Sequence, residues 1–324
     1  MSSDEISDTP AAPAPRVNAL RFDLQPQPQG YLWWYVDGIS DDGAHGFTMI
    51  AMLGSVFSPY YAWSGRHAPL DHVALNVAVY GGAGKRWALT ERRRTSLEQS
   101  AERLRIGPSG VRWDGTSLVV DIDEKGAPIP LPIRGRVRLT PAALTDRAFT
   151  LDPAGRHRWW PIAPCARIEV ELEKPARSWS GVGYLDMNQG TAPLEADFAG
   201  WHWSRLHLGG DSMIFYDATF RDGDGRVLAL ACHPDGRIED VEAPPRVELP
   251  TTGWRVRRAA RDGVPDRVRV RATYEDTPFY ARSLVTSGYG DRDGLAMHES
   301  LDLDRFAKSW VRVLLPFRMP RTRR

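Results

Sequence analysis

The stretch RVRVRATYEDTPFYAR, residues 267–282, has the two-residue alternation of a β-strand. One face would carry Arg267, Arg269, Arg271, Thr273 and Glu275, and the other would carry Val268, Val270, Ala272, Tyr274 and Asp276. The second face is apolar up to its last two members, so the pattern predicts that Tyr274 and Asp276 point inward together. Apolar surroundings disfavour a charged carboxyl, so we expect the pKa of Asp276 to be raised and the group to be an acid near neutral pH.

The same residues have a plainer interpretation. Pro278 follows closely and ends strand pairing, and an Asp before Thr-Pro is common in turns. On that interpretation Asp276 caps a turn and faces water. The alternation alone leaves both interpretations open.

The rest of the chain favours an all-β protein. Short apolar runs recur between 29 Gly and 25 Pro residues, RDGDG at 221–225 predicts a hairpin, and helical periodicity is nearly absent before a short helix near the C-terminus. The 324 residues suit two domains, and Lys174-Pro175 is the best break. We therefore predict a disordered tail over 1–18 and two β-barrel or sandwich domains in tandem, over 19–175 and 176–324. A barrel of that size holds one slender apolar ligand.

Composition excludes several function classes. The net charge of +1 gives no reason to expect nucleic acid as a partner. Cys165 and Cys232 form neither a disulfide framework nor a metal-binding spacing, and they fit a reduced, cytoplasmic setting. The acidic, Pro-rich N-terminus is no secretory signal, and no apolar run is long enough for a membrane-spanning helix.

The segment GSVFSPYYAW, residues 54–63, is aromatic but contains Gly and Pro, so we predict a loop. An exposed aromatic loop would be a lid, an entrance or a membrane contact. The alternative is that the loop folds over the end of the core.

Five segments carry a resemblance to a known family. They are WWYVDGISDDGAHGFTMIAMLGSVFSPYYAW (33–63), WSGVGYLDMNQG (179–190), WHWSRL (201–206), YEDTPFYAR (274–282) and LLPFRMPR (314–321). In these the chain resembles the carotenoid 1,2-hydratases, or hydroxyneurosporene synthases, of photosynthetic bacteria, within a wider two-domain lipocalin-like superfamily. The resemblance implies addition of water across the terminal 1,2 double bond of an acyclic carotenoid such as lycopene or neurosporene, with no cofactor and no metal.

The resemblance also implies site residues. The family's proposed acid is the Asp of a Tyr-x-Asp pair, carried over here to Tyr274-Glu275-Asp276, and an upstream Trp is carried over to Trp254. The side chains expected to contact the substrate are Trp201, Trp203, Tyr184, Phe279 and Tyr280. The candidates for holding the attacking water are Asp186, Asn188, His202 and Asp217. A carotenoid is insoluble in water, so we expect peripheral contact with the inner, photosynthetic membrane, with residues 54–63 as the candidate contact.

Two other functions fit the same residues. A lipocalin-type carrier of a terpenoid or pigment shares the apolar pocket without needing an inward acid. A cyclase or isomerase of the same superfamily protonates an alkene and quenches the cation internally. The oligomeric state, the preferred carotenoid and the number of ends hydrated stay open at this point.

Overall fold

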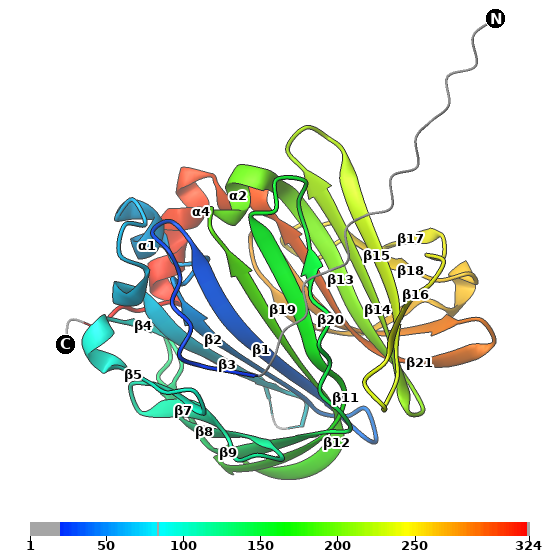
Figure 1. Cartoon of the computed structure of the whole chain (residues 1–324), viewed down its shortest axis with the longest axis horizontal. Coiled ribbons are helices and arrows are strands. Elements are labelled where there is room, and N and C mark those ends of the chain that lie inside the picture. Colours follow the sequence, from blue (N-terminus) through cyan, green and yellow to red (C-terminus); the bar gives the residue numbers. More distant parts are fainter. Residues whose placement is uncertain (1–19, 83, 323–324) are drawn as a thin grey trace, which may run out of the picture.

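The computed structural model describes residues 20–82 and 84–322, so the predicted tail over 1–18 lies outside the described residues. Twelve strands of this described part form the first sheet, which is antiparallel and curls around its own core (Figure 1). In spatial order they are β4 (Arg86–Arg92), β3 (Val73–Tyr80), β2 (Gly46–Leu53), β1 (Tyr31–Ser40), β12 (Ala176–Gly190), β11 (His157–Lys174), β9 (Pro132–Pro141), β8 (Leu118–Lys125), β7 (Ser109–Trp113), β6 (Arg103–Ile106) and β5 (Leu97–Gln99), with β10 (Phe149–Thr150) beside β11.

A second sheet of seven strands, counted over the same residues, packs against β1 and β12. Its order is β16 (Ile238–Asp240), β15 (Gly225–Cys232), β14 (Asp211–Phe220), β13 (Phe198–Leu208), β21 (Arg292–Asp302), β20 (Tyr280–Tyr289) and β19 (Arg269–Asp276). A small separate ribbon pairs β17 (Arg246–Leu249) with β18 (Arg258–Arg261). The all-β prediction is confirmed.

Strand β1 is buried along its whole length because both of its faces are covered. Trp34 and Val36 face the core inside the curled first sheet. Trp33 and Tyr35, on the other face, belong to a core shared with the second sheet. The aromatic run YLWWYV therefore has no polar face, as expected for a strand between two apolar layers.

The chain passes from the first sheet to the second after Gly190. The predicted boundary near residue 175 falls in the turn of the β11–β12 hairpin, and β12 lies between β1 and β11 within the first sheet. Pro175 ends one strand of that hairpin without ending the sheet. Residues 176–190, expected in the second domain, thus complete the first sheet.

Two buried arginines on the second sheet form an ion pair and hydrogen bonds with side chains on the first sheet. Arg205 of β13 forms an ion pair with Asp37 of β1, and both side chains are fully buried. Arg282 of β20 donates to the Thr48 hydroxyl at 2.8 Å and to the Tyr80 hydroxyl at 2.9 Å. Burying a charge costs free energy unless it is paired, so these contacts fix how the sheets sit on each other.

The short helices gather at one end of the sheets (Figure 1). These α-helices are α1 (Pro59–Trp63), α2 (Leu194–Asp197), α3 (Leu303–Phe306) and α4 (Ser309–Leu314). The 3-10 turns, which are spread along the chain, are η1 (Pro69–Asp71), η2 (Arg94–Ser96), η3 (Pro265–Arg267) and η4 (Leu315–Phe317). Glu195 of α2 connects them by accepting from Arg66, just after α1, and from Arg312 of α4 at 2.8 Å. The predicted C-terminal helix is present as α4.

Two local predictions need correction. Residues 54–63 are not all loop, because the Ser58 hydroxyl caps the backbone N–H of Tyr61 at 3.2 Å and Pro59 starts α1. Strand β19 does not alternate strictly, because register shifts against β20 occur at Val270/Ala272 and Thr273/Glu275. As a result, the neighbours Tyr274 and Glu275 are both buried, although alternation placed Glu275 on the wet face.

Candidate active site

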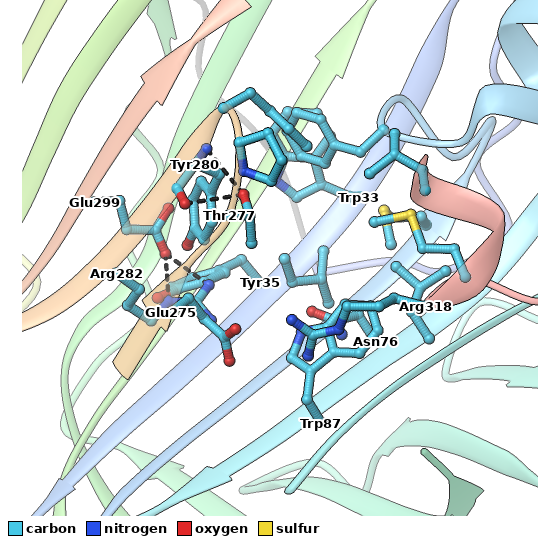
Figure 2. A pocket seen from close by; sticks show the side chains of 18 of the residues that line it. Trp33, Tyr35, Asn76, Trp87, Glu275, Thr277, Tyr280, Arg282, Glu299 and Arg318 are labelled. Atoms are coloured by element: carbon cyan, nitrogen blue, oxygen red, sulfur yellow. Dashed lines mark hydrogen bonds and ion pairs between the residues drawn. The ribbon is translucent and has the colours of Figure 1, made fainter. Parts of the chain in front are cut away.

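A cavity of about 390 Å³ lies between the two sheets and is closed on one side by the C-terminal segment (Figure 2). Most of its lining is aromatic or aliphatic: Trp33, Tyr35, Ile50, Met52, Phe57, Trp87, Leu89, Trp201, Trp203, Tyr216, Trp254, Pro278, Phe279, Tyr280, Leu314, Leu315, Phe317 and Met319. The polar lining comes from Asn76, Asp186, Asn188, Glu275, Asp276, Thr277, Arg282, Glu299 and Arg318. Such a cavity suits an apolar ligand with polar groups at a few fixed points.

Asp186 is the most buried carboxyl that lines this cavity without a cationic partner. It lies on β12 opposite Tyr35 of β1, and its exposed fraction is 4%. Its Oδ2 accepts from the Trp159 indole N–H at 2.8 Å and from the Tyr184 hydroxyl at 2.9 Å. Burial raises the pKa of Asp186 well above its ordinary value, and these two hydrogen bonds only partly oppose that effect. The protonated form of Asp186 therefore persists to higher pH than that of an exposed carboxyl.

The two hydrogen bonds also decide where that proton sits. Oδ2 already accepts two donors, so the acidic proton of Asp186 belongs on Oδ1. Oδ1 accepts one longer hydrogen bond, from the Asn188 side-chain amide at 3.5 Å. A carboxyl arranged in this way can release a proton and leave a carboxylate that two donors stabilise.

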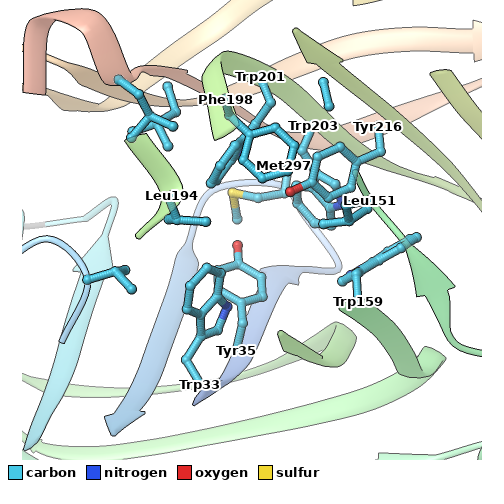
Figure 3. Packing of buried hydrophobic residues seen from close by; sticks show 14 of the residues in the cluster. Trp33, Tyr35, Leu151, Trp159, Leu194, Phe198, Trp201, Trp203, Tyr216 and Met297 are labelled. Carbon is cyan, nitrogen blue, oxygen red and sulfur yellow. The ribbon is translucent and has the colours of Figure 1, made fainter. Parts of the chain in front are cut away.

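Aromatic rings from both sheets surround this part of the cavity. Tyr35 and Trp203 have ring centroids 5.8 Å apart, Tyr184 and Trp203 5.3 Å, and Trp159 and Tyr216 5.5 Å. Figure 3 shows the Tyr35 hydroxyl directed toward the rings of the second sheet. That hydroxyl is buried and has no hydrogen-bond partner among the described residues. The faces of these rings favour a nearby positive charge.

Glu299 and Arg282 form a polar edge of the cavity (Figure 2). Glu299 Oε1 accepts from two guanidinium nitrogens of Arg282 at 2.7 and 2.9 Å. Glu275 is on the same side and accepts from Lys85 at 2.8 Å. Glu299 offsets the charge of Arg282, so that charge opposes a cation in the cavity less than a lone guanidinium would.

Asp276 and Trp254, two of the predicted catalytic residues, lie together at the exposed side of the cavity. Both Asp276 oxygens accept from the Trp254 backbone N–H at 3.3 Å, and Trp254 has an exposed fraction of 44%. Asp276 lines the cavity but is only half-buried. The third, Tyr274, is outside the cavity lining and stacks on Tyr80 with ring centroids 4.3 Å apart.

The predicted substrate contacts fall mostly on the cavity wall. Trp201, Trp203, Phe279 and Tyr280 line it, whereas Tyr184 lies behind the wall and contacts Asp186. Of the four candidates for holding water, Asp186 and Asn188 line the cavity. His202 bonds Ser300 at 2.8 Å, and Asp217 is paired with Arg261 outside it.

A family model described as carotenoid hydratase CrtC matches residues 49–324. The chain belongs to this family. The acyclic carotenoid 1,2-hydratase of Thiocapsa roseopersicina is 57% identical over 305 residues, which cover 93% of this chain and 75% of that protein. The enzyme of the same name from Rubrivivax gelatinosus is 52% identical over 312 residues, 94% of this chain and 76% of that protein. The resemblance stated from the sequence is confirmed.

Solved structures share the fold at low identity. A putative AttH from Nitrosomonas europaea superposes with a TM-score of 0.57 at 15% identity, covering 90% of this chain and 100% of that one. Kievitone hydratase from Nectria haematococca gives 0.53 at 11% identity, covering 90% and 97%. At these identities the likeness shows the architecture alone.

Within this hydratase, the sequence motif used to choose the acid is not unique. The spacing Tyr-x-Asp occurs four times, at Tyr35-Val36-Asp37, Tyr184-Leu185-Asp186, Tyr274-Glu275-Asp276 and Tyr289-Gly290-Asp291. The Tyr184 pair is the one in which the tyrosine hydroxyl contacts the carboxyl of its own motif at 2.9 Å. The signal for Asp186 was therefore present in the sequence. The contact of Trp159 with Asp186 was not predicted, because it depends on the pairing of β11 with β12.

Proposed function

We propose that this enzyme hydrates the terminal C1=C2 double bond of an acyclic carotenoid, with Asp186 as the proton donor. The observation that carries the proposal is a buried carboxyl, with its pKa raised by burial, among aromatic rings. The relatives named acyclic carotenoid 1,2-hydratase support the substrate class and the reaction. Asp276 is the alternative donor, but it is half-buried at the exposed side of the cavity.

The first step transfers the Asp186 proton to C2. The π electrons of the double bond form the new C–H bond, and C1 becomes a tertiary carbocation. Asp186 is left as a carboxylate, and the hydrogen bonds from Trp159 and Tyr184 to that carboxylate strengthen as its charge develops. The rings of Tyr35, Trp203 and the other wall residues contribute roughly 0.5–2 kcal/mol each toward a nearby cation.

The second step adds water to C1. A lone pair of the water oxygen forms the C1–O bond, and the resulting oxonium loses a proton to the Asp186 carboxylate, which restores the acid. We place the water near Tyr35, whose unpartnered hydroxyl lies on the strand next to Asp186, and near Asn188. The steps use only groups of this chain, the alkene and one water.

The test is a product analysis in heavy water. Lycopene presented in detergent should gain the mass of one water per hydrated end, and in D2O one non-exchangeable deuterium should appear at C2. A product of unchanged mass would instead indicate the cyclase or isomerase, and binding without product would indicate the carrier.

We also propose that the enzyme works at the cytoplasmic face of the inner membrane, because its substrate is dissolved in lipid. None of the helices in residues 20–82 and 84–322 has the length and apolarity needed to cross a bilayer. Attachment would then be peripheral and reversible. Residues 54–63 contribute little exposed aromatic surface to such contact. Phe57 lines the cavity, Tyr61 is buried, and Trp63 is the mainly exposed aromatic side chain of the segment.

A further inference from the structure

The C-terminal helix presents an apolar stripe to solvent beside the mouth of the cavity. Trp310, Val313, Leu314 and Phe317 follow the i, i+3, i+4, i+7 spacing of one helical face through α4 and η4. Their exposed fractions are 46%, 59%, 41% and 68%. The opposite side of the same segment, Val311 and Leu315, is buried. Burial in the core therefore does not explain the outer stripe.

Trp254 extends this stripe from another part of the chain. Its ring stacks on Trp310 with centroids 6.4 Å apart, and its carbonyl accepts from Arg305 at 2.7 Å. We call Trp254, Trp310, Val313, Leu314 and Phe317 the mouth patch. Three of its members, Trp254, Leu314 and Phe317, also line the cavity. The patch is thus continuous with the inner wall, and a ligand leaving the cavity there would pass over it.

Basic side chains border the mouth patch. Arg255 follows Trp254 directly, Arg257 is two residues further on, and Lys308 precedes Trp310 by two residues. All three are exposed, and none forms an ion pair within residues 20–82 and 84–322. An apolar stripe with Trp at its edge and a basic border matches the interface of a bilayer that contains anionic lipids.

We propose that the mouth patch docks on an anionic lipid surface, with Trp310, Val313 and Phe317 entering the headgroup region and Arg255, Arg257 and Lys308 contacting lipid phosphates. A docked molecule would have its cavity mouth against the lipid, so an apolar chain could enter without crossing water. The proposal rests on the proposed function for the identity of that chain. The docking itself is measured without substrate.

The experiment uses co-sedimentation of the full chain with vesicles of phosphatidylglycerol and phosphatidylcholine. Wild type should bind, more weakly at high salt and on phosphatidylcholine alone. The double variant Trp310→Ser/Val313→Ser, whose residues are outside the cavity lining, should bind at least about tenfold more weakly. Arg255→Gln/Arg257→Gln/Lys308→Gln should bind about a hundredfold more weakly, on anionic vesicles only, since each of the three basic residues contributes about fivefold.

The matched control is Ile129→Ser/Val227→Ser, which removes two exposed apolar side chains outside the mouth patch. It should bind as wild type does. Equal binding by Trp310→Ser/Val313→Ser and wild type, or an equal loss in the control, would overturn the proposal. Hydration of detergent-dispersed lycopene should be unchanged in Trp310→Ser/Val313→Ser. An absence of product from every protein, with vesicle binding intact, would reject the proposed function and leave the docking standing.

Discussion

The indole N–H of Trp159 lies 2.8 Å from Oδ2 of Asp186, across the neighbouring strands β11 and β12. Trp159 is fully buried, so its N–H has no competing water. A donor held in this way stabilises the carboxylate more than the neutral acid. In the proposed mechanism, the contact stabilises the carboxylate form of Asp186 that follows proton transfer, when the substrate would carry the positive charge.

Asp186→Asn should lower the rate of lycopene hydration by about 10²–10⁴-fold, because Asn has nearly the same shape and no acidic proton. Asp276→Asn is the matched control. Its rate of lycopene hydration should stay within about threefold of wild type, because only the loss of the group that donates the proton removes general acid catalysis. Turnover is measured in detergent by mass spectrometry, with thermal unfolding as the check on folding. The reverse ranking of the two variants would return the donor role to Asp276.

The rate should fall as pH rises through the raised pKa of Asp186, because the reaction needs the protonated form. The raised pKa of Asp186 also makes the free energy of unfolding depend on pH. A carboxyl whose pKa is higher in the folded state than in the unfolded chain favours folding below its unfolded pKa of about 3.9. That contribution is lost as pH rises through the folded value. The stability of Asp186→Asn should therefore depend less on pH between about 3.9 and the raised pKa of Asp186. A rate that rises with increasing pH would contradict the assignment.

Trp159→Phe removes the hydrogen bond and keeps an aromatic ring. We expect a loss of about ten- to hundredfold in kcat, which is the size expected for one hydrogen bond to a charged group. The same change should raise the pH above which the rate falls, because the hydrogen bond from Trp159 lowers the pKa of Asp186 and is lost in the variant. Trp160→Phe is the control, since Trp160 instead donates to Thr145 at 3.0 and 3.1 Å. A purely structural role for Trp159 would lower kcat without moving the pH limit.

Tyr35→Phe should lower kcat by about tenfold with little change in KM, if its hydroxyl holds the attacking water. Tyr274→Phe removes a hydroxyl that lies outside the cavity lining and should leave both constants near wild type. Steady-state kinetics with a shared detergent preparation compares the two. A rise in KM alone for Tyr35→Phe would assign the hydroxyl to substrate binding.

Arg205→Leu should destabilise the fold by about 3–5 kcal/mol, because it leaves the Asp37 carboxyl buried without its partner. The double variant Asp37→Leu/Arg205→Leu should recover most of that loss. Arg136→Leu breaks an exposed pair with Asp121 at 2.7 Å and should cost about 1 kcal/mol or less. Urea unfolding followed by fluorescence gives the three values. A double variant as unstable as Arg205→Leu would show that the cost comes from packing and not from the unpaired charge.

The strands were readable from the sequence because their signals are local. The run YLWWYV between glycines and the RDGDG turn specify β1 and the β14–β15 hairpin through residue type alone. The register shifts in β19 have no such local signal, because they are a property of its pairing with β20. For that reason alternation placed Tyr274 beside Asp276, whereas Tyr274 turns to Tyr80.

The sequence predicted the aromatic lining of the site better than it predicted which carboxyl would be the acid. Aromatic residues near Trp201 and Phe279 were expected and do line the cavity. The acid was harder to choose, because a carboxyl's pKa depends on what surrounds it in three dimensions. Asp186 was predicted as a candidate for holding water, and its contacts with Trp159 and Tyr184 become visible once β11 and β12 are paired.

The position of β12 in the first sheet has a consequence for chimaeras of related hydratases. A crossover at residue 175 would take Asp186 from one parent and Trp159 from the other. A crossover between Gly190 and Phe198, where the chain passes between the sheets, would keep the acid with its donor and exchange the facing wall of Trp201, Trp203 and Tyr216. Recombination at the second point exchanges the surface that contacts the substrate while the proton-transfer pair is inherited whole.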